Sequence, residues 1–178
     1  MAWEFVMDKM NQYNSLCEIG CFNGRITIIL SNYLKDKIYF GYDLNFFAIT
    51  IAKLVNFFVF PRKNLFYCEN AVKAHRERSE LFVSVGTIIY FSENEFKKFI
   101  NYLKENKSFK AFVMHEIFQN EEFSCANKSL VEGNLNIHSI SMIKDQFGED
   151  YEIKTYRTYY SNWERKGKIS AIISIKKK

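Results

Sequence analysis

Leu16 to Arg25 reads LCEIGCFNGR, and this stretch decides which fold the sequence predicts. A short apolar run ends at an acid, Glu18, and is followed by Gly20, by Gly24 and then by an apolar segment with helical spacing. Glycines between a strand and a helix allow a tight turn and let a ligand lie against the bare backbone. The stretch therefore predicts a strand, a ligand-binding turn and a helix.

A second acid follows at the end of the next strand-like run. Asp43 closes the segment KIYFGYD at positions 37–43, nineteen residues after Gly24. A carboxylate at the tip of the neighbouring strand can accept hydrogen bonds from both hydroxyls of a ribose. Together with the glycine turn, this acid indicates a cofactor that contains a nucleoside.

The order of residues in the turn separates two classes of cofactor. A dinucleotide-binding turn has the pattern G-x-G-x-x-G, but Gly20 is followed by CFNG at positions 21–24, so two glycines of that pattern are missing. Glu18 to Gly24 instead resembles motif I of the class I S-adenosylmethionine-dependent methyltransferases, an acid followed by G-x-G-x-G. Phe22 stands where that family commonly has its middle glycine, and its ring must turn away from the cofactor's methionine moiety or narrow the pocket.

The segment around the second acid carries the same resemblance. Asp43-Leu44-Asn45, with Ala48 and Ala52 on the following helix, resembles the family's second motif. The resemblance implies S-adenosylmethionine as cofactor, bound across the tips of the first, second and fourth strands. The cofactor contacts that it implies are Glu18, Gly20, Cys21, Phe22, Asn23, Gly24, Asp43, Leu44, Asn70, Ala71, Ser84, Val85 and Gly86.

Three of these residues have an alternative role that the sequence leaves open. Glu18 is expected to accept from the cofactor's ammonium group, but it can instead cap nearby backbone amides. Asp43 is expected to bind the ribose, and it can also serve as a helix N-cap. Asn70 is expected at the edge of the adenine, where a plain turn residue is the alternative.

Length and composition fit one globular domain over residues 1–178. Apolar residues make up 48% of the 178 and charged residues 25%, a balance typical of folded chains with a single core. No apolar run reaches the ~20 residues that span a bilayer, and acids within the first eight residues argue against a secretory signal. The four cysteines form no C-x-x-C pair, which favours free buried thiols in a reducing cytoplasm over a metal site.

Apolar periodicity predicts an α/β fold in which five strands alternate with helices and two strands close the chain as an antiparallel hairpin. Strands are expected at 15–19, 38–43, 64–68, 81–85, 111–115, 151–159 and 168–176, and helices at 1–14, 25–34, 45–58, 93–104 and 140–147. This is a Rossmann-like three-layer sandwich with helices on both faces of a mostly parallel seven-stranded sheet. The family resemblance implies the strand order 3-2-1-4-5-7-6, with the last strand antiparallel.

Two local features refine this layout. Ser92, with Glu95 three residues later, forms a capping-box pattern at the start of the helix expected at 93–104. The irregular polar stretch of the insertion at 119–140, together with the N-terminal helix at 1–14, is expected to form a lid over the methyl acceptor, because long loops at strand tips usually carry function.

Methyl transfer from a sulfonium mainly requires that nucleophile, methyl group and sulfur lie in a row. A general base helps only when the acceptor is a hydroxyl or a protonated amine. His115 and His138 are the candidate bases, and Tyr90 and Glu116 the candidate substrate contacts. No metal is expected, because Gly86-Thr87 stands where metal-dependent members of the family place acids.

The sequence thus predicts a methyltransferase that uses S-adenosylmethionine and acts on a small molecule, with a hydroxyl, including that of a sugar, as the first expectation. A nucleic-acid methyltransferase is one alternative, but the basic residues behind the net charge of +5 are dispersed except in the last three lysines. A binding protein of the same fold without turnover is another. Neither nucleic acid nor membrane is expected as a partner, and the oligomeric state, homodimer included, stays open.

Overall fold

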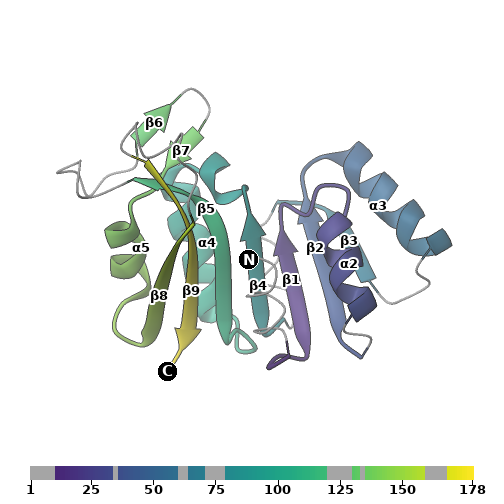
Figure 1. The fold of residues 1–178 in the computed structure, drawn as a ribbon, viewed down its shortest axis with the longest axis horizontal. Helices are drawn as coiled ribbons and strands as arrows, with labels where there is room; N and C mark the ends of the chain where they lie inside the picture. Colours follow the sequence, from purple (N-terminus) through teal and green to yellow (C-terminus); the bar gives the residue numbers. More distant parts are fainter. Residues whose placement is uncertain are drawn as a thin grey trace.

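The computed structural model describes residues 11–33, 36–59, 64–70, 79–119, 130–132, 135–158 and 168–178. Its elements, in chain order, are β1 (Ser15–Ile19), α2 (Arg25–Tyr33), β2 (Ile38–Asp43), α3 (Phe46–Val59), β3 (Asn64–Cys68), β4 (Leu81–Val85), the 3-10 helix η2 (Ile88–Tyr90), α4 (Glu93–Glu105), β5 (Ala111–Gln119), β6 (Leu130–Glu132), β7 (Leu135–Ile137), α5 (Ile140–Phe147), β8 (Tyr151–Thr158) and β9 (Lys168–Lys177). Seven strands form one sheet in the order β3-β2-β1-β4-β5-β9-β8, and β6 and β7 form a separate pair (Figure 1).

This arrangement confirms the predicted α/β class and the predicted strand order. The strands β1 to β5 run parallel, whereas β9 is antiparallel to both of its neighbours, β5 and β8. With β8 and β9 counted as the sixth and seventh strands of the sheet, the order is the expected 3-2-1-4-5-7-6. No helix in the described ranges is long and apolar enough to cross a membrane.

The two faces of the sheet build separate apolar layers, because successive strand residues point to opposite faces. Cys17 of β1 and Phe82 of β4 pack in one buried cluster with residues of α4 and α5. Leu16 and Leu81, their neighbours in sequence, belong to a second cluster with Leu30 of α2. Helices therefore cover both faces, as predicted, with α2 and α3 on one side and α4 and α5 on the other (Figure 1).

Two differences from the predicted layout concern β5 and the segment after it. β5 extends to Gln119 instead of His115, because β9 pairs with it antiparallel along its whole length, as far as Gln119 against Lys168. The expected insertion at 119–140 contains the short hairpin of β6 and β7, which sequence reasoning missed. Residues 1–10 of the expected N-terminal helix and residues 120–129 of the expected lid lie outside the described residues.

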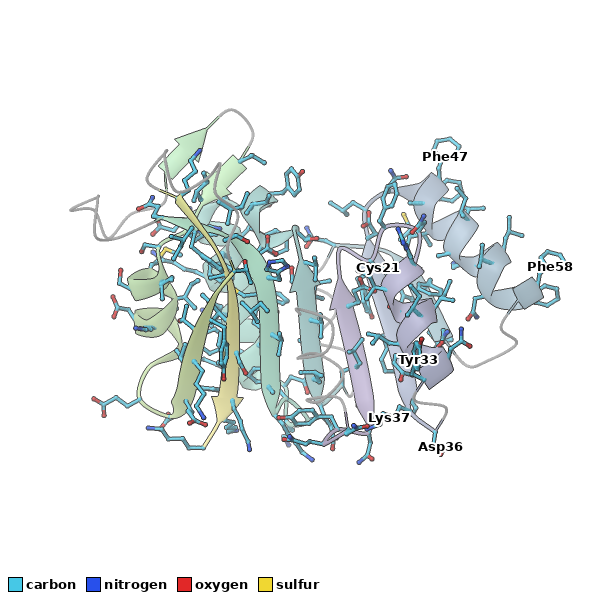
Figure 2. All side chains as sticks on the ribbon, viewed as in Figure 1. Cys21, Tyr33, Asp36, Lys37, Phe47 and Phe58 are labelled. Carbon is cyan, nitrogen blue, oxygen red and sulfur yellow. The ribbon has the colours of Figure 1, made fainter. Side chains whose placement is uncertain are left out.

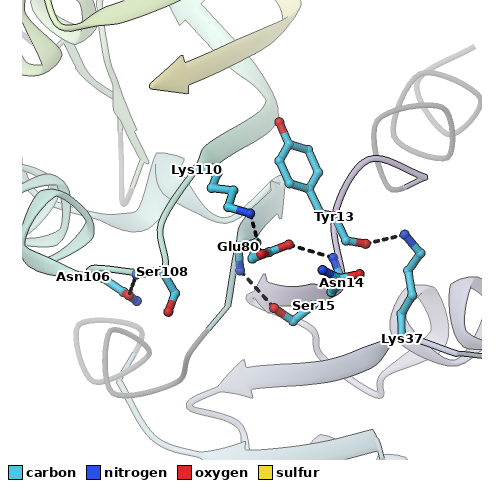
Figure 3. Close-up of polar contacts among 8 residues, drawn as sticks. All are labelled: Tyr13, Asn14, Ser15, Lys37, Glu80, Asn106, Ser108 and Lys110. Atoms are coloured by element: carbon cyan, nitrogen blue, oxygen red, sulfur yellow. Dashed lines mark hydrogen bonds and ion pairs between the residues drawn. The ribbon is translucent and has the colours of Figure 1, made fainter. Parts of the chain in front are cut away.

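The starts of four strands are tied together at one edge of the sheet (Figure 3). The Glu80 carboxylate, just before β4, accepts from the Asn14 backbone N–H at 2.8 Å and from Lys110 Nζ at 2.6 Å. The Glu80 N–H in turn donates to Ser15 Oγ at 3.0 Å, and Lys37 Nζ donates to the Tyr13 carbonyl. These contacts join β1, β2, β4 and β5 at the edge opposite the cavities described below.

The cysteines agree with the prediction only in part. Cys17 and Cys21 are free and buried, as expected. Cys68 is free but exposed, because it is the last residue of β3, at the outer end of the sheet. Cys125 lies outside the described residues.

Candidate functional site

A cavity of about 440 Å³ lies across the carboxyl ends of β1, β2, β3 and β4. In open parallel sheets this edge is where ligands bind, because the strand order reverses there and leaves a crevice. The residues that line the cavity are Gly20, Phe22, Tyr42, Asp43, Leu44, Glu69, Asn70, Val85, Gly86, Thr87, Tyr90, Phe91 and Glu95. We call it the first cavity.

The turn after β1 forms one wall of the first cavity and has an unusual backbone. Gly20 has φ +72°, and Phe22 has φ +48°, the left-handed region that side chains other than glycine rarely adopt. The Phe22 N–H donates to Asp43 Oδ2 at 2.8 Å, which holds the turn against the end of β2. A side chain at Gly20 has no room, because its Cβ would lie 1.9 Å from Thr87 Oγ1.

Asp43 also organises the start of α3. Its Oδ1 accepts from the Asn45 N–H at 2.8 Å, and Asn45 Oδ1 accepts from the Ala48 N–H at 3.0 Å. The N-cap of α3 is therefore Asn45, which settles the alternative left open for Asp43. A carboxylate has about four lone-pair directions, so the half-exposed Asp43 keeps acceptor capacity toward the cavity.

Glu18 lies beneath the turn and is buried. Its Oε2 accepts from the Thr27 backbone N–H at 3.1 Å and from the Thr27 hydroxyl, so this acid ties β1 to the first turn of α2. Burial raises the pKa of Glu18 to about 8, against the lowering effect of the two bonds from Thr27. The geometry agrees with the capping alternative for Glu18, and this residue is not among those that line the first cavity.

Glu116 fixes the loop that follows β4. Its Oε1 accepts from Ser84 Oγ at 2.8 Å, from the Thr87 N–H at 2.9 Å and from the Ile88 N–H at 3.0 Å. Its Oε2 is buried and has no hydrogen-bond partner within the described part of the chain. Burial raises the pKa of Glu116 to about 7, so the group is poised between its charged and neutral forms near neutral pH.

A second cavity of about 240 Å³ lies beside the first, and both are walled by Val85 and Gly86. The other residues that line it are Ile89, His115, Glu116, Ile117 and Ser170. His115 Nε2 lies 3.3 Å from Ser170 Oγ and 3.4 Å from Thr158 Oγ1, and the Thr158 hydroxyl donates to Ser170 Oγ at 2.8 Å. Burial lowers the pKa of His115, which favours the neutral imidazole.

The structure brings most of the predicted cofactor contacts together and separates a few. Gly20, Phe22, Asp43, Leu44, Asn70, Val85 and Gly86 line the first cavity, together with Tyr90, which was expected at the substrate. Of the other residues expected at the cofactor, Glu18, Cys21, Asn23, Gly24 and Ser84 are not part of its described lining, and Ala71 lies outside the described residues. Gly24 is needed for packing, because a Cβ there would lie 2.7 Å from the Phe66 ring.

The two candidate bases have different surroundings. His115 lines the second cavity. His138 is 1% exposed, its ring stacks on Phe96, and its Nε2 lies 3.3 Å from the Ile88 carbonyl oxygen. Of these two candidates, His138 is therefore packed in the core, whereas His115 lies at a cavity.

Sequence reasoning missed several residues of the two cavities. Thr87, Glu69 and Phe91 directly adjoin predicted residues in the chain, so a wider window around each motif would have included them. Ser170 of the second cavity, and Thr158, which bonds to it, had no local signal. They meet His115 only because β9 pairs with both β5 and β8, a register that depends on the folded sheet.

No protein-family model matches this chain, and no curated protein matches it by sequence. Solved structures do match. The magnesium protoporphyrin IX methyltransferase of Synechocystis PCC 6803, with bound S-adenosylmethionine, has a TM-score of 0.72 at 13% identity, over 99% of this chain and 78% of that one. An O-methyltransferase from a Brevibacillus brevis polyketide synthase, in complex with S-adenosylhomocysteine, has a TM-score of 0.78 at 8% identity, over 99% and 70%.

A third match extends the likeness to nearly the full length of a neighbour. The methyltransferase domain of a bacterial Hen1 has a TM-score of 0.68 at 14% identity, over 98% of this chain and 96% of that one. The chain has the fold of the class I S-adenosylmethionine-dependent methyltransferases.

Proposed function

We propose that the protein is a methyltransferase that binds S-adenosylmethionine in the first cavity and methylates a small molecule in the second. The observation that carries the proposal is the turn after β1. A left-handed Phe22 backbone, hydrogen-bonded to the carboxylate at the tip of β2, borders a cavity on the ligand-binding edge of the sheet. Backbone strain of this kind costs about 1–3 kcal/mol and is concentrated at functional sites.

The residues around the first cavity fit each part of the cofactor. Asp43 offers carboxylate lone pairs for ribose hydroxyls, and Leu44 and Asn70 offer an apolar surface and an amide for adenine. Gly20 and Gly86 leave bare backbone for the methionine part. The volume of about 440 Å³ lies within the usual range for small-ligand sites. When bound, the cofactor supplies an activated methyl group.

The second cavity is proposed as the acceptor site, with a hydroxyl as the acceptor group. His115, kept neutral by burial, accepts the hydroxyl proton as the oxygen attacks. Ser170 and Thr158 orient the imidazole. The buried Glu116 Oε2 is available for a second polar group of the acceptor. Val85, Ile89 and Ile117 make the rest of this lining apolar, so the proposed acceptor joins a hydroxyl, such as that of a sugar, to an apolar face.

Cofactor binding is tested by calorimetric titration with S-adenosylhomocysteine, in the wild type and in Asp43→Ala. The wild type is expected to bind S-adenosylhomocysteine in preference to NAD. Asp43→Ala is expected to bind about tenfold to several hundredfold more weakly, because it loses charge-assisted hydrogen bonds of about 1.5–3 kcal/mol each. The variant also leaves the Phe22 and Asn45 N–H groups without their acceptor, so its melting temperature is expected to fall.

Asp36→Ala is the matched control, since Asp36 is an exposed acid that Figure 2 shows at the opposite edge of the sheet. It is expected to bind S-adenosylhomocysteine like the wild type. The decisive measurement is the rise in melting temperature when S-adenosylhomocysteine is added. For each variant this rise is compared with the melting temperature of the same variant without ligand. A full wild-type shift in Asp43→Ala, or tighter binding of NAD, would refute the proposal.

The acceptor proposal is tested by transfer of a labelled methyl group to a panel of sugars and other small alcohols. His115→Ala is expected to lower kcat by about 10²–10⁴-fold while the affinity for S-adenosylhomocysteine stays unchanged. In the wild type, the rate is expected to fall only below pH 6.5, because burial moves the pKa of His115 below that value. An unchanged kcat in His115→Ala would show that His115 is not the base. The same conclusion would follow if the rate of the wild type did not fall at low pH.

A further inference from the structure

The outer side of α3 carries a set of large apolar side chains that the fold leaves in solvent. They are Phe46, Phe47, Ile51, Leu54, Phe57 and Phe58, with exposed fractions of 51–79%; we call this set the α3 outer face. Figure 2 shows the two labelled members, Phe47 and Phe58, directed away from the sheet at the outer end of the molecule. Exposed apolar patches of this size mark interaction sites on soluble proteins.

The spacing within the α3 outer face is that of a helix that packs against another helix. Phe47, Ile51, Leu54 and Phe58 follow each other at intervals of four, three and four residues, the seam of a coiled coil. The opposite side of α3 is already packed, with Ala48, Ile49 and Ala52 buried against the sheet. α3 is thus apolar on both its sides, which is typical of a helix buried all round.

We infer that the α3 outer face is a dimer interface, occupied by the same face of a second copy of this chain. A two-fold contact needs a patch that is complementary to itself, and the six uncharged members place no like charges opposite each other. Lys53 is the one charged residue of α3 and lies outside the stripe of seam positions. The side chains of Phe47, Ile51, Leu54 and Phe58 can therefore interdigitate with the same side chains of a second chain.

The available area agrees with a stable interface between two copies. An aromatic side chain buries about 150–250 Å² when fully covered, so the exposed fractions of the four phenylalanines correspond to about 440–730 Å² per copy, to which Ile51 and Leu54 add. A stable interface takes about 800 Å² from each partner. Complete burial of the α3 outer face would therefore give a contact close in size to a stable interface.

The test is the mass of the full chain in solution, measured by light scattering and sedimentation across a range of concentrations. The wild type is expected at twice 21.2 kDa. Leu54→Glu is expected to raise the dimer dissociation constant by at least about 100-fold, because each dimer would bury two carboxylates in an apolar contact. Leu54 is half-exposed in the single chain, so circular dichroism and S-adenosylhomocysteine binding are expected to stay as in the wild type.

Tyr33→Glu is the matched control, because Tyr33 is also an exposed large side chain, more exposed than Leu54, but lies on α2, away from the α3 outer face (Figure 2). It is expected to remain dimeric. A wild type that stays monomeric at every concentration overturns the inference, and so does a Leu54→Glu variant that stays dimeric. Sedimentation of a monomeric wild type with vesicles of phosphatidylcholine and phosphatidylglycerol would overturn it in favour of a membrane surface. None of these readings depends on methyl transfer.

Discussion

Phe22 holds the most constrained backbone position in the described part of the site. It is the one residue other than glycine with positive φ among the described residues, and its side chain is 57% exposed at the first cavity. The left-handed region costs a residue with a Cβ about 1–2 kcal/mol. The bond from its N–H to Asp43 offsets part of that cost. The family's middle glycine therefore has a physical reason at this position, which the sequence alone did not reveal.

Substitutions at Phe22 are expected to separate backbone strain from side-chain contacts. Phe22→Gly removes the steric cost of φ +48° and loses little burial, so the free energy of unfolding is expected to stay within about 1 kcal/mol of the wild type. Phe22→Val is expected to be less stable than Phe22→Gly by about 1–2 kcal/mol, because a β-branched side chain fits the left-handed region least well. Urea denaturation of the two variants measures the difference.

The same pair of variants also reports on the cofactor site. Phe22→Gly is expected to bind S-adenosylhomocysteine at least as tightly as the wild type, because the bond from residue 22 N–H to Asp43 is kept while the cavity becomes wider. A loss of affinity in Phe22→Gly would show that the Phe22 ring itself contacts the ligand. Equal stability of the Gly and Val variants would show that the turn relaxes and carries no strain.

Between elements, the buried hydrogen bonds that Thr27 donates to the Glu18 carboxyl group connect strand β1 with helix α2. Parallel strands and their covering helices usually pack through apolar side chains, and Glu18 instead places a carboxyl group in that layer. Burying an ionised carboxylate is costly, so the group takes up a proton more readily in the folded chain than in the unfolded one. The stability of the strand–helix contact therefore depends on pH.

The sign of that dependence follows from the pKa values. The pKa of Glu18 is about 8 in the folded protein and 4.5 ordinarily, so between these values the folded state holds a proton that the unfolded state has lost. Stability is expected to fall as pH rises from 4.5 to 8, by at most about 1.4 kcal/mol per pH unit from this group. Glu18→Gln keeps an acceptor for Thr27 and is expected to lose this part of the slope.

Urea denaturation at pH 5 and pH 8 measures the slope in each variant. Glu116, whose pKa is raised in the same direction, leaves a residual slope in Glu18→Gln. Glu105→Gln, at the exposed end of α4, is the control and is expected to show the slope of the wild type. If Glu18→Gln and the wild type lose stability equally between the two pH values, Glu18 does not carry a proton in the folded protein.

The bounds of a helix or strand were predictable from the sequence where they depend on residues close together in the chain. The capping box of α4 is confirmed, with Ser92 Oγ accepting from the Glu95 N–H and the Glu95 side chain accepting from the Ser92 N–H. β1, β2, β3 and β4 have the predicted bounds, because each is a short apolar run that ends at a turn residue. The end of β5 was predicted four residues too early, since its last residues depend on pairing with β9 and not on their own pattern.

Across the whole molecule, the two ends of the strands differ: one end is held by hydrogen bonds and the other carries the cavities. One edge is fixed by the contacts of Glu80 with Asn14, Ser15 and Lys110, which hold the starts of the strands together (Figure 3). The other edge keeps two neighbouring cavities at the strand ends. The hydrogen-bonded end and the end that carries the cavities are therefore opposite ends of the same strands.

By itself, the sequence determined the α/β class and placed the glycine turn and Asp43 at strand tips, and the family resemblance implied the strand order. Apolar periodicity, the glycine turn and Asp43 at a strand tip are local signals, and in a parallel sheet strand tips meet at one edge. Only the tertiary structure decided what lies beyond those tips. The contact of His115 with Ser170 and Thr158, the burial of His138 and the exposure of the α3 outer face all depend on distant segments packing together. No local pattern encodes which side chains such packing covers and which it leaves open.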